Sequence, residues 1–140
     1  MIAPERDARL FEIVSYAILK AHFATEIIFI GRTFDSIEEQ ALKLFKTGRT
    51  NANDGGIDFV MTPLGRFFQV TETLDVKKYF LDIDKIERYP ISFVVKTIIE
   101  VKEIQEILKK GAIEQYGVQE VVKRYMDSIE EIWFFRFCNG

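Results

Sequence analysis

The fold of this chain is decided by residues 54–72, which read DGGIDFVMTPLGRFFQVTE. Two glycines allow the backbone to turn tightly, and a run of strand-forming residues then covers 57–62. Residues 63–65 read Pro-Leu-Gly, which is turn chemistry, and a second strand-forming run covers 66–73. The stretch therefore predicts a β-hairpin.

Asp58 and Gln69 lie symmetrically about this turn, so the predicted hairpin places them nearly opposite each other. Two oxygen-bearing side chains then come within reach of one divalent cation. Hard cations such as Mg²⁺ take oxygen ligands and keep several waters for substrate phosphates. The hairpin is thus a candidate metal site. In the simpler alternative, Asp58 only begins a strand after a glycine turn, and Gln69 is an ordinary polar strand residue.

The elements around the hairpin follow from hydrophobic spacing. Helical periodicity predicts helices over 7–23, 74–88, 100–111 and 118–133, and another from 35 or 36 to 45. The helix over 7–23 is apolar nearly all round, so we expect it to be buried on more than one side. Apolar β-type runs predict strands at 26–30 and 91–98, and residues 47–56 predict a loop. We expect a single α/β domain over residues 1–140, with a mixed sheet flanked by helices.

The hairpin stretch resembles the PD-(D/E)xK nuclease superfamily, which has the restriction-endonuclease-like fold. That motif has an Asp on one strand, then Glu or Gln, any residue, and Lys on the next strand. Gly-Gly-Ile-Asp58 followed by Phe-Phe-Gln69-Val looks especially like the branch that contains methylated-DNA-cleaving restriction endonucleases. The resemblance covers residues 7–98 and implies an α-β-β-β-α-β core. Many members add an acid from the first helix, and Glu12, the only acid within residues 10–19, matches it.

The resemblance implies a DNA endonuclease that hydrolyses phosphodiesters with Mg²⁺ or Mn²⁺. The metal ligands would be Asp58, the amide oxygen of Gln69 and the backbone carbonyl of Val70. Glu12 would contact the metal directly or through water, and a water with a lowered pKa would attack phosphorus in line. Arg66, at the far end of the hairpin, is expected to lie away from the metal. A set of basic and amide side chains would approach the DNA backbone: Lys43, Lys46, Arg49, Asn51 and Asn53.

One position departs from the family motif. The family lysine falls at Thr71, and threonine cannot offset the negative charge that develops on the phosphate. In one interpretation the lysine has moved in sequence, to Lys77, Lys78 or Lys96. In a second, Thr71 or Glu72 takes part directly and the metal supplies most of the charge stabilisation. In a third, the site is inactive and the domain only binds or assembles.

Charge and composition restrict the class of protein. The net charge of −3 and the pI near 5.3 oppose a protein that coats nucleic acid through a uniformly basic surface. One cysteine, Cys138, and one histidine, His22, exclude an internal disulfide framework and a Cys/His zinc site. No apolar run approaches the ~18 residues of a membrane span, and the first residues lack signal-peptide character, so we expect a cytoplasmic protein.

The segment 133–137 reads WFFRF and is an apolar patch near the end of the sequence. Such a patch favours a homodimer or association with another subunit. The length leaves little room for a separate sequence-reading domain, so a cleavage subunit or a domain of a larger enzyme also fits. A structure-specific resolvase is a variant. The competing class is a catalytically inactive nuclease-fold module that binds DNA or a protein partner, and the missing lysine favours it.

Overall fold

A computed structural model describes residues 4–47, 57–71, 75–86, 90–97 and 99–135 of the chain. The elements in these ranges follow one another as α1 (Pro4–Phe23), β1 (Ile27–Ile30), the short 3₁₀ helix η1 (Phe34–Ser36), β2 (Glu38–Ala41), β3 (Lys43–Lys46), β4 (Phe59–Thr62), β5 (Arg66–Thr71), α2 (Val76–Lys85), β6 (Ile91–Lys96), α3 (Val101–Tyr116), α4 (Gln119–Ser128) and β7 (Ile129–Phe135). The protein is therefore of mixed α/β class, as the sequence predicts.

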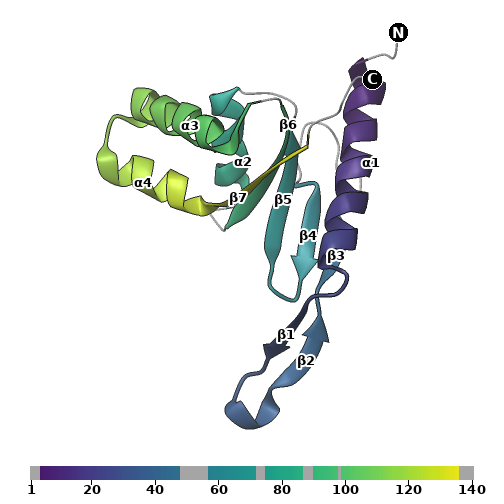
Figure 1. Cartoon of the computed structure of the whole chain (residues 1–140). Helices are drawn as coiled ribbons and strands as arrows, with labels where there is room; N and C mark the ends of the chain where they lie inside the picture. Colours follow the sequence, from purple (N-terminus) through teal and green to yellow (C-terminus); the bar gives the residue numbers. More distant parts are fainter. Residues whose placement is uncertain (1–3, 48–56, 72–74, 87–89, 98, 136–140) are drawn as a thin grey trace.

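The strands form two separate sheets. One has five strands in the order β3-β4-β5-β6-β7, with antiparallel pairing from β3 to β5 and parallel pairing from β5 to β7. The other is an antiparallel ribbon of β1 and β2. We call residues 27–41, which comprise this ribbon and η1, the arm. Figure 1 shows the arm extending beyond the C-terminal end of α1, away from α2, α3 and α4.

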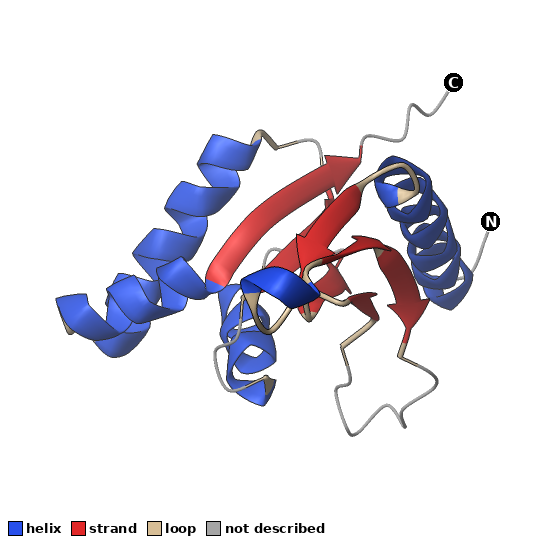
Figure 2. Ribbon diagram, turned by 90° about the horizontal axis from the view of Figure 1, so that it is seen from below, coloured by secondary structure: helices blue, strands red, loops and turns tan. Residues whose placement is uncertain are grey.

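Helices cover both faces of the five-stranded sheet (Figure 2). α1 lies on one face, and α2, α3 and α4 lie on the other. On the first face, Phe11 and Leu19 of α1 belong to one buried cluster with residues of three strands: Phe59, Phe68 and Val94. Burial of these large apolar side chains holds α1 on the sheet.

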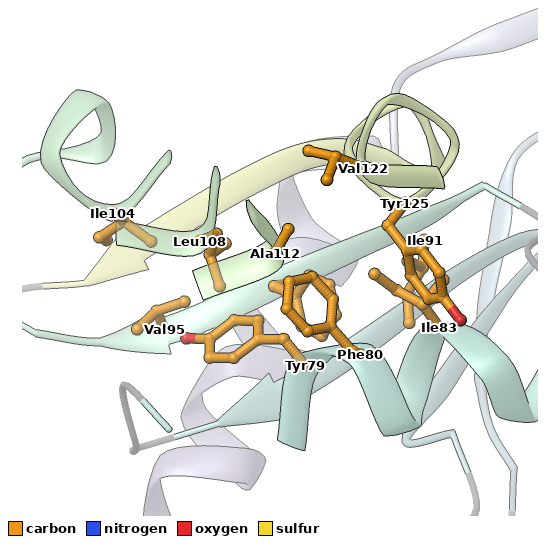
Figure 3. Packing of buried hydrophobic residues seen from close by; sticks show 11 residues of the cluster. Tyr79, Phe80, Ile83, Ile91, Val95, Ile104, Leu108, Ala112, Val122 and Tyr125 are labelled. Atoms are coloured by element: carbon orange, nitrogen blue, oxygen red, sulfur yellow. The ribbon is translucent and has the colours of Figure 1, made fainter. Parts of the chain in front are cut away.

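The second face carries the other buried cluster (Figure 3). Side chains from α2, α3 and α4 meet β6 there, and they include Tyr79, Phe80, Leu108, Val122 and Ile91. Because β6 is covered on both sides, all five residues from 91 to 95 are buried. This explains why the sequence shows a nearly continuous apolar run there rather than an alternation of apolar and polar residues.

The predicted helix from 35 or 36 to 45 is wrong. The structure has only the short η1, and β2 and β3 follow it. Leu44 is buried in β3, where the backbone pairs with β4 at Met61. Pairing of β2 with β1 and of β3 with the hairpin overrides the helical spacing of the apolar residues, because neighbouring strands offer hydrogen bonds that local periodicity does not reveal.

The predicted helix over 118–133 is too long. α4 ends at Ser128, and β7 begins at Ile129 and runs parallel to β6. The β-branched and aromatic residues of this segment favour a strand, and Ile132 packs against the second cluster from β7. The exposed acids Glu130 and Glu131 made the segment look like a continuation of the helix.

α1 is buried on one side only, which corrects the expectation of burial on several sides. Phe11, Ser15 and Leu19 are buried, whereas Leu10 and Ile13 are about half exposed, at 53% and 47%. The outer face of α1 therefore carries apolar side chains that nothing in the described part of this chain covers.

No helix in the described part of the chain is both long enough and apolar enough to cross a membrane.

Candidate functional site

The hairpin brings Asp58 and Gln69 together, as its symmetry predicts. The register pairs Phe59 with Phe68, so Asp58, just before β4, stands opposite Gln69 of β5. The backbone N–H of Asp58 donates to Gln69 Oε1 at 3.2 Å. The backbone N–H of Val70 donates to Asp58 Oδ2 at 2.8 Å. The aspartate thus closes the end of the β4–β5 ladder and is fixed in place by the neighbouring strand.

An open pocket of about 570 Å³ lies at the carboxyl end of β5. Side chains from both helical layers and from the hairpin line it: Ala8, Arg9, Glu12, Asp58, Gln69, Val70, Thr71 and Lys78. Glu12 reaches the pocket from α1 and Lys78 from α2, which cover opposite faces of the sheet. The pocket therefore forms where the end of the sheet leaves room between the two layers, which is where open α/β sheets commonly bind ligands.

The carboxyl group of Asp58 is in an environment that opposes its charge. Partial burial, as the largest cause, raises its pKa from 3.8 to about 6. The hydrogen bond from Val70 lowers the pKa, the carboxylates of Glu12 and Asp82 raise it, and the ammonium of Lys78 lowers it. A partly buried carboxylate with acidic neighbours is stabilised by a cation beside it, so the charges of this site favour binding of a positive ion.

The oxygen donors fit a hard divalent cation. In a strand, the N–H and C=O of one residue point toward the same neighbour, so the Val70 carbonyl is on the side of Asp58, as its N–H is. Across the described ranges, no three His, Cys, Asp or Glu side chains are grouped to hold a metal. A cation here would therefore need the amide oxygen of Gln69 and the Val70 carbonyl in addition to Asp58 and Glu12. That is the ligand set that the resemblance implies.

The three candidate lysines have different surroundings. Lys78 lines the pocket and acts on the charge of Asp58. Lys77 is exposed in the first turn of α2 and does not line the pocket. The ammonium of Lys96 lies 5.9 Å from the ring centre of Phe11, on the α1 side of the sheet, and does not line the pocket either. The structure thus brings one of the three lysines to the candidate site.

The structure describes only some of the remaining predicted residues. Thr71 is buried and lines the pocket. Lys43 and Lys46 belong to β3, where residues three apart face opposite sides, and the Lys46 ammonium lies 4.8 Å from the ring centre of Tyr16. The two lysines therefore do not form one basic surface. Four predicted residues lie outside the described ranges: Arg49, Asn51, Asn53 and Glu72.

Two residues of the site were missed by the sequence analysis. Arg9 lines the pocket one helical turn before Glu12, and that spacing is the signal that identifies it. Asp82 is buried in α2, where its Oδ1 accepts a hydrogen bond from Lys85 Nζ at 3.2 Å. Its Oδ2 has no hydrogen-bond partner among the residues that the structure describes. Burial raises the pKa of Asp82. An acid among the buried residues of an amphipathic helix is the sequence signal for it.

Two other expectations concern regions away from the pocket. Arg66 forms an ion pair with Glu130 of β7 at 3.0 Å and does not line the pocket. Trp133, the first residue of the C-terminal apolar patch, packs on the end of α1 with ring centres 4.9 Å from His22 and 6.0 Å from Phe23. At least this part of the patch is used within the chain, and residues 136–140, with Cys138, lie outside the described ranges.

Comparison with known proteins found no match for this chain among family models, curated proteins or solved structures.

Proposed function

We propose that this chain is the catalytic domain of a metal-dependent DNA endonuclease of restriction type. The observation that carries the proposal is the shared pocket of Asp58, Gln69, Glu12 and Lys78. These residues come from two helices and a hairpin that are far apart in the sequence. The oxygens of an acid and an amide can hold a divalent metal, and a lysine can offset negative charge on a phosphate, so these residue types around one open pocket suit metal-dependent phosphodiester hydrolysis.

The order of elements supports the same proposal. α1, β3, β4, β5, α2 and β6 follow one another as α-β-β-β-α-β, with the arm inserted after α1. Asp58 and Gln69 lie at the β4–β5 hairpin, which corresponds to the motif position in the restriction-endonuclease-like fold. The agreement between this order of elements and the order that the resemblance implies supports the proposal more than the short motif alone, because a short motif recurs by chance.

Mg²⁺ or Mn²⁺, when bound, would lower the pKa of the attacking water and stabilise the negative charge on the leaving oxygen. The residues of this chain would hold the metal and orient the phosphate beside it. Asp58, Gln69 and the Val70 carbonyl form the rigid part of the oxygen cradle, because the β4–β5 ladder fixes them. Glu12 completes it from α1, on the opposite side of the pocket from Lys78.

Lys78 takes the part of the family lysine in this proposal. Its ammonium is close enough to lower the pKa of Asp58, and it lines the same pocket. A positive charge there offsets the negative charge that develops on the phosphate in the transition state. The guanidinium of Arg9, with its several donors, suits a phosphate oxygen at the rim of the pocket.

A second candidate is an inactive module that binds DNA or a protein. The observation that favours it is the mutual hydrogen bonding of the hairpin. Gln69 Oε1 accepts from the Asp58 N–H, and one oxygen of Asp58 accepts from Val70. These hydrogen bonds already occupy oxygens of Asp58 and Gln69, and Thr71 stands in the lysine position. In this second candidate the hydrogen bonds only stabilise the end of the hairpin, and no metal binds.

Cleavage of plasmid DNA in Mg²⁺ tests the proposal, with both modified and unmodified plasmids. Asp58→Ala and Lys78→Ala are expected to lower the nicking rate at least about 100-fold, since one charge-stabilising group is typically worth that much. Lys77→Ala is the matched control, because it removes the neighbouring exposed lysine, and it should retain the rate. A four-way junction as substrate tests the resolvase variant.

Equal nicking by wild type and Asp58→Ala would mean that the activity comes from a contaminant or from another site. Binding of DNA without any cleavage, unchanged by Asp58→Ala, would favour the inactive module instead.

A further inference from the structure

Exposed large apolar side chains are concentrated on α1 and the arm. In the described ranges, eight of the thirteen such side chains lie within residues 10–37. The most exposed are Phe34, at 94%, in η1 at the tip of the arm, and Phe29, at 70%, in β1. A concentration of exposed apolar side chains in one part of a protein is typical of an interaction site.

The outer face of α1 is one part of this surface. Leu10, Ile13 and Ala17 recur at helical spacing on the side turned away from Phe11 and Leu19, which face the sheet. All three outer residues are exposed. Lys20, one turn after Ala17, is exposed beside this apolar stripe. The outer face of α1 therefore combines an apolar stripe with a positive charge at its edge.

The composition of the arm is complementary to that of the outer face of α1, because it combines apolar with acidic residues. β1 reads IIFI, and β2 reads EEQA. The register pairs Phe29 with Glu39 and Ile30 with Glu38, so an apolar strand lies directly beside an acidic one. At the tip, a Cβ on Gly31 would lie 2.5 Å from the Ser36 carbonyl oxygen, so only glycine allows this close approach.

The arm has little support from the part of its own chain that the structure describes. An isolated two-stranded ribbon is marginally stable in water. Ile28 is the arm residue that packs against the first buried cluster, as a partly buried member. A second surface that covers β1 would supply the missing apolar contacts. The acidic strand opposes a nucleic acid or an anionic membrane as that surface and favours one that carries basic residues.

We propose that a second copy of this chain supplies that surface, in a homodimer in which each arm lies along the outer face of the partner's α1. Ile27 and Phe29, the exposed apolar side chains on one face of β1, then cover the stripe of Leu10, Ile13 and Ala17. The carboxylate of Glu39, which is paired with Phe29 and shares its face of the ribbon, lies near Lys20. Both complementary surfaces belong to every copy, so a two-fold axis satisfies them together.

The shape of the chain allows this arrangement. The arm continues beyond the C-terminal end of α1 (Figure 1). A two-fold axis near residues 23–26 therefore places each arm beside the other copy's helix, with the two helices antiparallel. α1, with 20 residues, is about 30 Å long, and residues 27–34 reach at most about 26 Å, so the lengths match. α1 and the arm span residues 4–41, enough for the roughly 20–30 residues that each partner of a stable interface contributes.

The mass of the protein in solution, measured by light scattering after gel filtration without DNA or metal, tests the dimer independently of nuclease activity. We expect twice the 16.3 kDa of the chain at about 50 μM. Ile13→Glu and Phe29→Glu should each give the mass of one chain, because each places a charge in the apolar contact. Leu81→Glu is the matched control. It changes a 60% exposed leucine of α2, outside the proposed interface, and should stay dimeric.

Charge reversal tests the arrangement itself. Lys20→Glu and Glu39→Lys should each weaken dimerisation at least about tenfold by placing like charges together. Combining the two changes in one chain should restore it, which a merely misfolded variant would not do. Circular dichroism checks that every variant is folded. A wild-type chain that runs at single-chain mass up to 100 μM, an Ile13→Glu dimer, or a failed restoration would each overturn the proposal.

Discussion

The surroundings of Asp58 disfavour the negative charge of its carboxylate. Among the described residues, burial and the carboxylates of Glu12 and Asp82 raise its pKa to about 6, while Val70 and Lys78 act in the opposite direction. A group that costs stability in this way is typical of a functional site. The cost has a definite pH dependence. A carboxyl group with a raised pKa binds its proton more tightly in the folded chain than in the unfolded chain. The free energy of unfolding should therefore increase as the pH falls from about 6 toward about 4.

Asp58→Asn is expected to stabilise the protein by about 1–2 kcal/mol at pH 8. A raised pKa of about 6 corresponds to ~3 kcal/mol for a fully shielded group, and solvent screens part of it here. The asparagine oxygen can still accept from the Val70 N–H. The gain should fade toward pH 4, where the wild-type carboxyl group is protonated in the folded state. Urea denaturation at pH 4.5, 6 and 8 measures this.

Glu106→Gln serves as the control for that measurement, because Glu106 is exposed in α3, away from the pocket and from the arm. Its effect should be close to zero at every pH. A lower stability of Asp58→Asn at pH 8 would contradict the account of the site given above.

At the scale of elements, α2 carries Lys78 to the pocket, and its beginning is fixed by local chemistry. The Asp75 side chain caps the helix by accepting from the Lys77 N–H at 3.1 Å. Asp75→Ala is expected to cost about 1 kcal/mol in the free energy of unfolding. Asp75→Asn, which keeps a capping oxygen, should cost much less. Thermal melts of the two variants measure the difference, and an equal loss in both would mean that the cap is not the cause.

The contact between α2 and α3 depends on a glycine. A Cβ on Gly111 of α3 would lie 2.4 Å from Val76 Cγ1 of α2, so Gly111→Ala must push the two helices apart. We expect it to destabilise the fold by about 1–3 kcal/mol, although alanine favours a helix more than glycine does. Adding Val76→Ala should recover part of the loss in urea denaturation. Strictly additive losses would show that the two side chains do not meet.

At the scale of the whole molecule, the pocket exists only because two helical layers meet at one end of the sheet. α1 contributes Glu12, the hairpin contributes Asp58 and Gln69, and α2 contributes Lys78. A ligand that bridges these parts binds the folded chain and not the unfolded one, so it stabilises the entire fold.

Mg²⁺ is accordingly expected to raise the melting temperature of the wild-type protein at pH 8. At a concentration 100 times the dissociation constant, the gain in the free energy of unfolding is about 2.7 kcal/mol. Asp58→Ala should abolish this shift and Lys77→Ala should keep it, as followed by thermal melts with and without Mg²⁺. An equal shift in Asp58→Ala would place the cation elsewhere.

Hydrophobic spacing and turn residues correctly predicted those elements whose local sequence preference agrees with their place in the fold. The helix over 7–23, the hairpin and the buried strand near 91–98 all agree with the structure to within a few residues. The juxtaposition of Asp58 and Gln69 followed from the symmetry of one turn. The helices predicted near 36–45 and 129–133 were wrong because these segments form strands that pair with other strands: β2 with β1, β3 with β4, and β7 with β6. The partners of β3 and β7 are distant in sequence, so local periodicity does not reveal them.

The sequence by itself therefore determined the α/β class and the facing pair in the hairpin, since both depend on contacts within about fifteen residues. Only the tertiary structure decided that Lys78, rather than Lys77 or Lys96, shares the pocket, and that Arg9 and the buried Asp82 belong to its surroundings. The physical reason is that α1 and α2 approach the same end of the sheet from opposite faces. Their relative placement is set by the packing of two separate apolar clusters, and no local pattern of residues encodes it.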